Sequence, residues 1–338
     1  MYQKTVSSRE EGQRFDKFLY KILPEAGNGF ICKMLRRKNI TLNDKKADAC
    51  DKIKAGDIVK IYFADDTLAK FMGERTENVY QNAYDSLKDK IHILFENEDI
   101  LAADKASGVL SQKAEPDDIS VNEWLIGYMI DSGEMTDKEL ISFAPSVCNR
   151  LDRNTSGIIL CGKTITGEQL LSEMLRTRTI DKFYIAAVLG KIDSPKEISG
   201  YLIKDKKRNK VTVIKESPDP DNDNTFEEAS PIHTFYSPLY YDKSLDASLI
   251  EVKLLTGKTH QIRAHLSSEG HPIIGDMKYG NERKNIYFRD RFGIKSQMLH
   301  CQKVIFPSDD RLKGASGKEI DSPAPAEFVR TFEDYVSV

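Results

Sequence analysis

The segment Asn149-Arg-Leu-Asp-Arg-Asn-Thr-Ser-Gly-Ile-Ile-Leu160 decides the fold prediction, because it joins a polar stretch to an apolar one. A polar segment that leads into a short apolar run predicts a loop followed by a buried strand, here over residues 158–161. In the loop, Asp152 stands between Arg150 and Arg153, and flanking cations favour an ionised carboxylate that can act as a nucleophile. A surface aspartate in a turn is the simpler interpretation of the same residue.

Apolar patterning on both sides of this segment predicts a domain that mixes strands with a few helices. Further strands are predicted at 92–95, 100–103, 182–190 and 249–255. Helices are predicted at 118–132, 166–177 and 257–266, and Gly270 is the expected stop of the last one. An acidic loop is predicted at 216–230. Because strands and helices do not alternate regularly, the pattern favours an α+β fold over a doubly wound sheet.

Charge is divided unevenly along the chain. Residues 1–65 contain fourteen Lys or Arg and nine Asp or Glu, a net charge of +5, so the remaining residues carry −8 of the overall −3. The overall charge gives no indication of a nucleic-acid partner. The uneven distribution of charge does indicate such a partner, because it is typical of chains that contain a nucleic-acid-binding module.

The basic N-terminal part has the pattern of a small domain. A helix is predicted at 15–23, a second helix after Gly29, and short strands at 40–43 and 59–63. The second helix places Ile31, Met34 and Leu35 on one side and Lys33, Arg36 and Arg37 on the other. The basic run from Lys33 to Lys38 is either a nucleic-acid contact or an ordinary solvated face. Residues 66–90 show no clear apolar period and are predicted to be a linker.

Composition excludes several classes of protein. The 338 residues, 40% hydrophobic and 30% charged, suit a globular chain of about two domains. No run approaches the ~18 apolar residues of a membrane helix, and the N-terminus is too polar for a secretory signal. The five cysteines are far apart and form no CxxC, which argues against disulfides and a cysteine zinc site. A reducing, cytoplasmic location is therefore expected.

Two formal motifs predict little chemistry. Gly157 to Thr164 fits GxxxxGK[ST], but apolar strand formers stand between its glycines, where a phosphate-binding loop needs a flexible turn. His260, His265 and His271 are five and six residues apart, which puts the first two on different faces of a helix. These histidines are therefore interpreted as hydrogen-bonding or RNA-facing residues rather than metal ligands.

Three blocks of the sequence resemble the RluA-type pseudouridine synthases. Residues 149–160 resemble HRLDxxTSGxxL, residues 182–190 resemble K-x-Y-x-A-x-V-x-G, and residues 254–280 resemble TGRTHQIRxHL…GHPIxGDxxYG. Residues 96–110 resemble, more weakly, the block in which the family usually has Lys-Pro-x-Gly. The sequence departs from the pattern at Asn149 for His, Ala106 for Pro and Lys258 for Arg. Lys258 keeps the charge and loses the planar guanidinium, and none of the three changes removes Asp152.

Ahead of these blocks, residues 12–64 (GQRFDKFL…MLRRKNITLN…IKAGDIVKIYF) resemble the S4 RNA-binding domain. The two resemblances imply an S4-like domain at 1–65, a linker at 66–90, a catalytic domain at 91–310 and a C-terminal extension at 311–338. They imply an α+β fold, in which the catalytic domain has a mixed, mostly antiparallel sheet and the small S4 domain is α/β.

The resemblance also implies an isomerase that converts specific uridines of RNA to pseudouridine. Asp152 is the implied nucleophile or base, and the target nucleotide has to flip out of its helix to reach it. Arg150 would fill or brace the vacated space, Tyr184 would stack on the uracil, and Arg263 would hold Asp152 ionised. Without the motifs, Tyr184 is interpreted as a core aromatic and Arg263 as a surface arginine. Further RNA contacts are expected from Lys33, Arg36, Arg37, Lys38, Arg153, Lys258 and His260.

Partners and cofactors follow from the same resemblance. The reaction has no redox step or group transfer, so no cofactor and no metal are expected. The expected partner is 23S-type large-subunit ribosomal RNA, with transfer RNA as the alternative, and the expected state is a monomer with no membrane partner. Because the chain beyond residue 65 is acidic, a local basic cleft is expected around Arg150, Arg153, Lys258 and Arg263. A non-catalytic RNA- or ribosome-binding factor that kept the fold is the alternative of another class.

Overall fold

The computed structural model describes residues 1–72, 79–136, 139–205, 210–216 and 229–336, which divide into two compact units. Unit 1 comprises Met1–Ala102, Ser111–Arg150 and Leu160–Glu173. Unit 2 comprises Ala103–Leu110, Leu151–Ile159 and Met174–Val338. Two of the five points at which the chain passes from one unit to the other lie within strands β5 (Ile100–Lys105) and β7 (Ser156–Gly162). Within the described ranges, every helix is too short or too polar to cross a bilayer.

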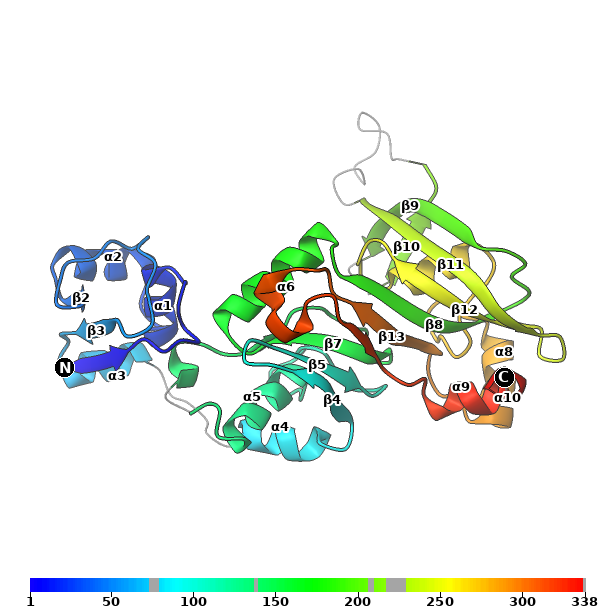
Figure 1. Cartoon of the computed structure of the whole chain (residues 1–338), viewed down its shortest axis with the longest axis horizontal. Coiled ribbons are helices and arrows are strands. Elements are labelled where there is room, and N and C mark those ends of the chain that lie inside the picture. Colours follow the sequence, from blue (N-terminus) through cyan, green and yellow to red (C-terminus); the bar gives the residue numbers. More distant parts are fainter. Residues whose placement is uncertain (73–78, 137–138, 206–209, 217–228, 337–338) are drawn as a thin grey trace. The chain divides into compact units, whose positions relative to one another are not determined.

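The N-terminal part of unit 1 is a three-stranded antiparallel sheet with two helices, at the blue end of Figure 1. The sheet order is β1-β3-β2, and β3 pairs with both neighbours. The elements are β1 (Tyr2–Thr5), α1 (Phe15–Ile22), α2 (Asn28–Arg36), β2 (Ile40–Leu42) and β3 (Ile58–Ile61). The predicted faces of α2 are confirmed, with Ile31, Met34 and Leu35 buried and Lys33, Arg36 and Arg37 exposed.

Residues 66–90 differ from the expected linker. Their described parts form helix α3 (Asp65–Met72) and helix α4 (Val79–Leu87). Phe71 of α3 packs on the N-terminal core, with its ring centroid 4.6 Å from that of Phe30. Each helix contributes only a few apolar residues, which is too weak a period to detect in the sequence. Packing against other elements of the same chain stabilises these helices instead.

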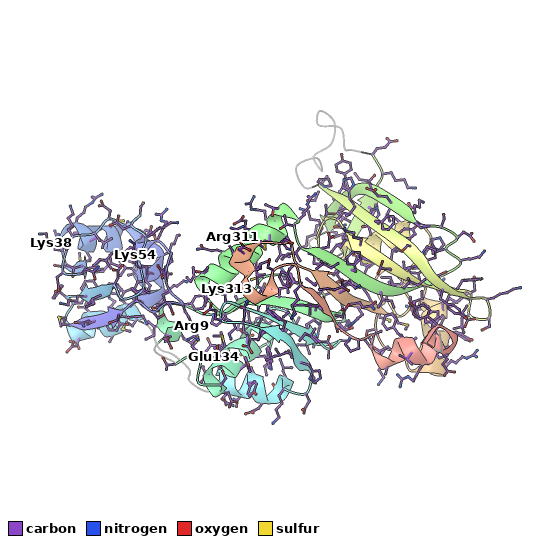
Figure 2. The ribbon with its side chains drawn as sticks, in the orientation of Figure 1. Arg9, Lys38, Lys54, Glu134, Arg311 and Lys313 are labelled. Carbon is purple, nitrogen blue, oxygen red and sulfur yellow. The ribbon has the colours of Figure 1, made fainter. Side chains whose placement is uncertain are left out.

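The rest of unit 1 carries strands in the order β7-β5-β4 and helices α5 and α6. These elements are β4 (Ile91–Glu96), α5 (Val121–Asp131), β6 (Ser146–Val147) and α6 (Ile165–Thr177). Helix α5 begins at a capping box, in which Ser120 and Glu123 satisfy the free backbone amides of the first turn. Arg9 and Glu134, labelled in Figure 2, form an ion pair in which Nη2 of Arg9 lies 3.5 Å from Oε2 of Glu134.

The segment that fits the phosphate-loop pattern is a strand, as predicted. Gly157 and Gly162 both lie within the buried strand β7. Lys163, which would bind phosphate in such a loop, is buried and pairs with Glu96 at 2.5 Å and with Glu134 at 2.7 Å. Its charge is therefore already compensated by carboxylates of unit 1.

Unit 2 is built on a mixed sheet, and the prediction of a mostly antiparallel one is confirmed. The strand order is β10-β9-β11-β12-β8-β13-β7, antiparallel throughout except for the pair β13–β7. The strands are β8 (Asp181–Leu189), β9 (Lys196–Asp205), β10 (Lys210–Ile214), β11 (Ser230–Asp242), β12 (Ala247–Leu254) and β13 (Leu299–Ile305). Of the predicted acidic loop 216–230, residues 217–228 lie outside the described residues.

The helices of unit 2 are α7 (Gln261–Ser268), α8 (Glu282–Phe292), α9 (Ala326–Thr331) and α10 (Glu333–Val336), with the short strand β14 (Glu319–Asp321) beside β13 (Figure 1). The polar-looking chain after Pro307 contributes to the core. Phe328 and Phe332 are buried in one cluster with Ile185 of β8 and Phe288 of α8. The C-terminal segment therefore packs as part of unit 2.

His265 makes the stability of unit 2 sensitive to acid. It is 1% exposed, its Nδ1 lies 3.0 Å from the Thr234 hydroxyl, and burial lowers its pKa to about 4. The unfolded histidine binds a proton near pH 6.5, and the folded one does not. The folded state therefore loses stability relative to the unfolded state as the pH falls from 6.5 to 4. The loss from this group is expected to approach about 3 kcal/mol, from ~1.36 kcal/mol per pKa unit.

Urea unfolding at pH 7 and pH 4.5 tests this expectation. His265→Gln, which cannot be protonated, should show a smaller loss of unfolding free energy between the two pH values than the wild type. Equal losses in the two proteins would contradict the assignment.

Candidate active site

A chain of two carboxylates and one guanidinium lies within unit 2. The Nη1 atom of Arg263 donates to Asp152 Oδ2 at 2.7 Å. On its other edge, Arg263 donates from Nε to Asp276 Oδ2 at 2.7 Å and from Nη2 to Asp276 Oδ1 at 2.9 Å. The side chains of Asp276 and Arg263 are 0% and 7% exposed, whereas that of Asp152 is 23% exposed. The accessible end of the chain is therefore the carboxylate of Asp152.

The buried pair holds Arg263 charged and oriented. Burial alone raises the pKa of Asp276, but the hydrogen bonds and charge of Arg263 lower it below its usual value. Asp276 also accepts from the backbone amides of Lys278 and Tyr279, at 2.8 and 3.1 Å. Because a bidentate guanidinium–carboxylate contact fixes the plane of both groups, Asp276 directs the remaining Nη1 of Arg263 toward Asp152.

Helix α7 positions Arg263, and it begins later than predicted. The expected start was residue 257, but the helix begins at Gln261, after His260 in a left-handed conformation with φ 55°. The side-chain oxygen of Gln261 accepts from the Lys258 amide at 3.1 Å and from the Thr256 hydroxyl at 2.9 Å. These bonds hold residues 257–260 as a turn, because they replace the backbone bonds that a helix would make there.

Tyr279, which was not predicted as a site residue, connects several groups of the site. Its hydroxyl lies 2.9 Å from His260 Nδ1 and accepts from the Val211 amide at 2.9 Å. Its ring centroid lies 5.3 Å from the guanidinium carbon of Arg263. The candidate RNA contact His260 is thus held against the same residue that stacks on the central arginine. Burial lowers the pKa of His260, while Asp152 acts in the opposite direction.

Lys105 stabilises the loop that carries Asp152 by hydrogen bonds to backbone carbonyls. Its side chain is fully buried, and its ammonium donates to the carbonyls of Ala106, Val109 and Arg153 at 3.1, 2.9 and 3.2 Å. The Gly108 amide donates to the same Arg153 carbonyl at 2.9 Å. Burial lowers the pKa of Lys105 to about 7, against the opposing effect of Asp152. The lysine therefore joins the 106–109 loop to the residue next to Asp152.

Replacing Lys105 by methionine is expected to destabilise the protein by about 2–4 kcal/mol. The change keeps the length of the side chain but removes the Lys105 donor from the carbonyls of Ala106 and Val109 and leaves the Arg153 carbonyl with the Gly108 amide alone. Urea unfolding measures the loss. Lys113→Met is the matched control, since Lys113 is exposed and donates to one carbonyl, that of Pro116. Equal stability of the two variants would contradict the role of Lys105.

Tyr184 lies on β8, opposite Cys301 of β13 in the sheet register. It is 5% exposed, and burial, together with Cys301 and Asp152, raises its pKa well above the usual range. Gly157 permits the close approach of β7 on the other side of Cys301, because a Cβ at that glycine would lie 2.3 Å from the Cys301 carbonyl oxygen. Of the four predicted catalytic residues, Asp152, Tyr184 and Arg263 lie in unit 2 and Arg150 lies in unit 1.

The other predicted residues are exposed. In unit 2, Arg153 donates from Nε to the Gly108 carbonyl at 3.2 Å, and Lys258 is exposed on the turn before α7. In unit 1, Arg150 is exposed, as are the four cations Lys33, Arg36, Arg37 and Lys38 on and after α2. Lys38 is drawn on the surface of this part in Figure 2. The basic cleft expected around Arg150, Arg153, Lys258 and Arg263 stays a prediction.

Three residues of the site that the sequence did not predict nevertheless stand in recognisable blocks. Asp276 and Tyr279 both stand in the block 254–280, and Lys105 stands in the weaker block 96–110. Among the described residues, no three His, Cys, Asp or Glu side chains are grouped so that they could hold a metal ion.

Comparison with known proteins identifies relatives along most of the chain. A family model described as RNA pseudouridylate synthase matches residues 99–268. An uncharacterized RNA pseudouridine synthase of Mycoplasma genitalium is 32% identical over 307 residues, which cover 89% of this chain and 88% of the relative. The ribosomal large subunit pseudouridine synthase C of Rickettsia bellii is 31% identical over 326 residues, covering 94% and 96%. The structure of human RNA pseudouridylate synthase domain containing 4 has a TM-score of 0.59 at 19% identity, over 76% of this chain and 97% of that one, and shows the fold alone.

Proposed function

We propose that this chain, which belongs to the RNA pseudouridylate synthase family, converts specific uridines of large-subunit ribosomal RNA to pseudouridine with Asp152 as its catalytic group. In this reaction the N1–C1′ glycosidic bond breaks, the uracil turns, and C5 bonds to C1′, while the hydrogen of C5 leaves as a proton and N1 takes up a proton. The observation that carries the proposal is the 2.7 Å bond from Arg263 to the partly exposed carboxylate of Asp152.

The arrangement of charges supports this role for Asp152. A carboxylate that attacks C1′ or removes a ribose proton has to be ionised and held in one orientation. Arg263 fixes the orientation of the Asp152 carboxylate and places a positive charge beside it, because Asp276 already fixes the guanidinium from the buried side. Lys105 holds the backbone of the loop next to Asp152. Asp152 is therefore the one member of this group with room to meet a substrate.

The reaction needs the target uridine outside the RNA stack, since a base inside a helix cannot reach the carboxylate. Arg150, which is exposed, would occupy the space that the base leaves. Tyr184 would stack on the extruded uracil, a contact of ~1–3 kcal/mol. Arg153, Lys258 and His260 would contact the RNA around the flipped nucleotide, and their side chains are exposed or partly exposed.

The N-terminal part is proposed to be an S4-type RNA-binding module. Its support is the sheet β1-β3-β2 with α1 and α2, and the row of exposed cations on and after α2. Lys33, Arg36, Arg37 and Lys38 would bind phosphates, which adds affinity without sequence specificity and weakens with salt. The five free cysteines suit a reducing compartment, and we propose that the enzyme acts there as a monomer.

Large-subunit ribosomal RNA is the proposed substrate because relatives that match over more than nine-tenths of the chain carry that substrate in their names. Release of tritium from an unmodified transcript labelled at C5 of uridine tests both the activity and the substrate. We expect release from the large-subunit ribosomal transcript and none from a transfer-RNA transcript pool. Release from transfer RNA alone would mean that transfer RNA is the substrate. No release from any cellular RNA would contradict the proposed enzymatic activity.

A further inference from the structure

Helix α8 carries a basic and aromatic face that the proposed reaction does not use. Residues 281–295 contain five Lys or Arg and two Asp or Glu, a net charge of +3, in the part of the chain beyond residue 65 that is acidic overall. At 100° per residue, Arg283, Lys284, Tyr287 and Arg291 fall within an arc of about 100°. These four residues, all exposed, are here called the α8 face. The opposite side buries Asn285 and Phe288.

The α8 face borders a hollow in the surface of unit 2. A depression of about 470 Å³ is lined by Ser244, Leu245, Asn281, Arg283, Lys284 and Tyr287. Three of the four residues of the α8 face therefore share one concave surface with the turn between β11 and β12. Within the described part of the chain, neither Arg283 nor Lys284 has an ion-pair partner, so both charges are available to an anionic ligand.

Tyr287 is held in place beside these cations. It is 40% exposed, its hydroxyl accepts from Nη1 of Arg291, and the guanidinium carbon of Arg291 lies 5.7 Å from its ring centroid. Exposed aromatic rings beside cations are the features that bind single-stranded nucleic acid, since bases stack on the ring and phosphates meet the charges. An acidic protein would match the charges and would leave the exposed ring without a stacking partner.

The α8 helix is also anchored to the candidate active site. The side chain of Asn285 donates to the Asp276 carbonyl at 2.9 Å and accepts from the Gly275 amide at 2.8 Å. Asp276 is the residue that holds Arg263. A ligand on the α8 face is therefore bound by an element fixed to the backbone that supports the catalytic group.

We propose that the α8 face is a second RNA-binding site, which holds an unpaired nucleotide and its phosphates outside the catalytic centre. The inference rests on the proposed function, because it takes the RNA substrate as the ligand. It adds a site in unit 2 that contacts RNA independently of the cations on α2. Its expected contribution is to affinity and to the salt dependence of binding, and not to the chemical step.

Binding of an unmodified large-subunit ribosomal transcript, measured by filter retention between 50 and 200 mM salt, tests the proposal. All proteins carry Asp152→Asn, so that no turnover changes the RNA. Arg283→Gln/Lys284→Gln is expected to bind about tenfold more weakly and to reduce the slope of log affinity against log salt by about 1.5, as for two lost phosphate contacts. The matched control Lys204→Gln/Lys318→Gln removes two exposed charges, one on β9 and one just before β14, and should stay within twofold of the parent.

Substitutions of Tyr287 distinguish the contribution of base stacking to RNA binding from that of charge. Tyr287→Ala is expected to weaken binding about five- to tenfold with an unchanged salt slope, because a stacked base is lost and no phosphate contact is. Tyr287→Phe keeps the ring and should bind within twofold of the parent. Poly-glutamate at equal charge is expected to compete poorly. Equal competition by poly-glutamate, or equal losses in the lysine control, would overturn the site as an RNA site.

The outcomes for the site and for the function are distinct. If the wild type releases tritium and Arg283→Gln/Lys284→Gln binds as well as its parent, the α8 site is wrong and the function stands. If no RNA releases tritium but the binding differences appear, the site stands and the enzymatic function fails.

Discussion

Asp152→Asn is expected to reduce tritium release by a factor on the order of 10⁴ or more, because loss of a nucleophile or essential base leaves only binding and orientation. The folded state should change little. Asparagine can still accept from Nη1 of Arg263, and Arg263 keeps both of its bonds to Asp276. We expect a change in unfolding free energy of about 1 kcal/mol, measured by urea unfolding.

The comparison variant for this prediction is Asp152→Glu, which keeps the charge and moves it by one methylene. We expect it to retain some activity but at least about a hundredfold less than the wild type, since displacement of a reacting group by about 1 Å has that effect. RNA affinity should be unchanged in both variants. Tritium release by Asp152→Asn within tenfold of the wild type would remove Asp152 from the chemistry.

Arg263→Gln is expected to have the largest combined effect on stability and activity. The substitution removes three hydrogen bonds and leaves the Asp276 carboxylate, which is 0% exposed, without a counter-charge. Loss of one partner from a buried ion pair costs about 3–5 kcal/mol. Activity should fall as well, because Asp152 loses the group that orients it. Urea unfolding and tritium release measure the two effects separately.

A second substitution distinguishes the two effects of Arg263. Arg263→Gln/Asp276→Asn removes the uncompensated charge and is expected to recover most of the lost stability. It should not recover activity, because Asp152 still lacks its guanidinium partner. Recovery of both properties would mean that Arg263 acts only through stability. Recovery of neither would contradict the account of Asp276 as a buried charge that needs Arg263.

The sequence predicted several elements correctly because their own apolar residues are numerous and regularly spaced. The faces of α2 and the strands β7, β8 and β12 are of this kind. Strand β11, in contrast, was not predicted. It contains Pro231 and Pro238, its register shifts after Pro238, and it is stabilised by pairing with β9 and β12 along its length. Helices α3 and α4 were missed for a similar reason, since packing and not periodicity stabilises them.

The candidate site divides in the same way. Asp152, Tyr184 and Arg263 were identified from motifs, but the functions of Asp276, Tyr279 and Lys105 could not be, because each acts through a residue distant in sequence. Lysine is mostly exposed in folded proteins. Nothing in the residues beside Lys105 indicates that its side chain is buried and donates to three carbonyls. Only the folded chain brings it to Arg153.

The sequence by itself determined the residue types of the chemistry and the local elements that carry them, because helical and strand periods and short motifs are properties of neighbouring residues. The tertiary structure decided which charges meet. It brought Asp152 and Arg263, 111 positions apart, to 2.7 Å, and gave Arg263 a buried second carboxylate. It also set the exposed cations of α8 beside the β11–β12 turn. The physical reason is that electrostatic and hydrogen-bond energies depend on distance in space and on burial, and the packing of the whole sheet and its helices fixes both.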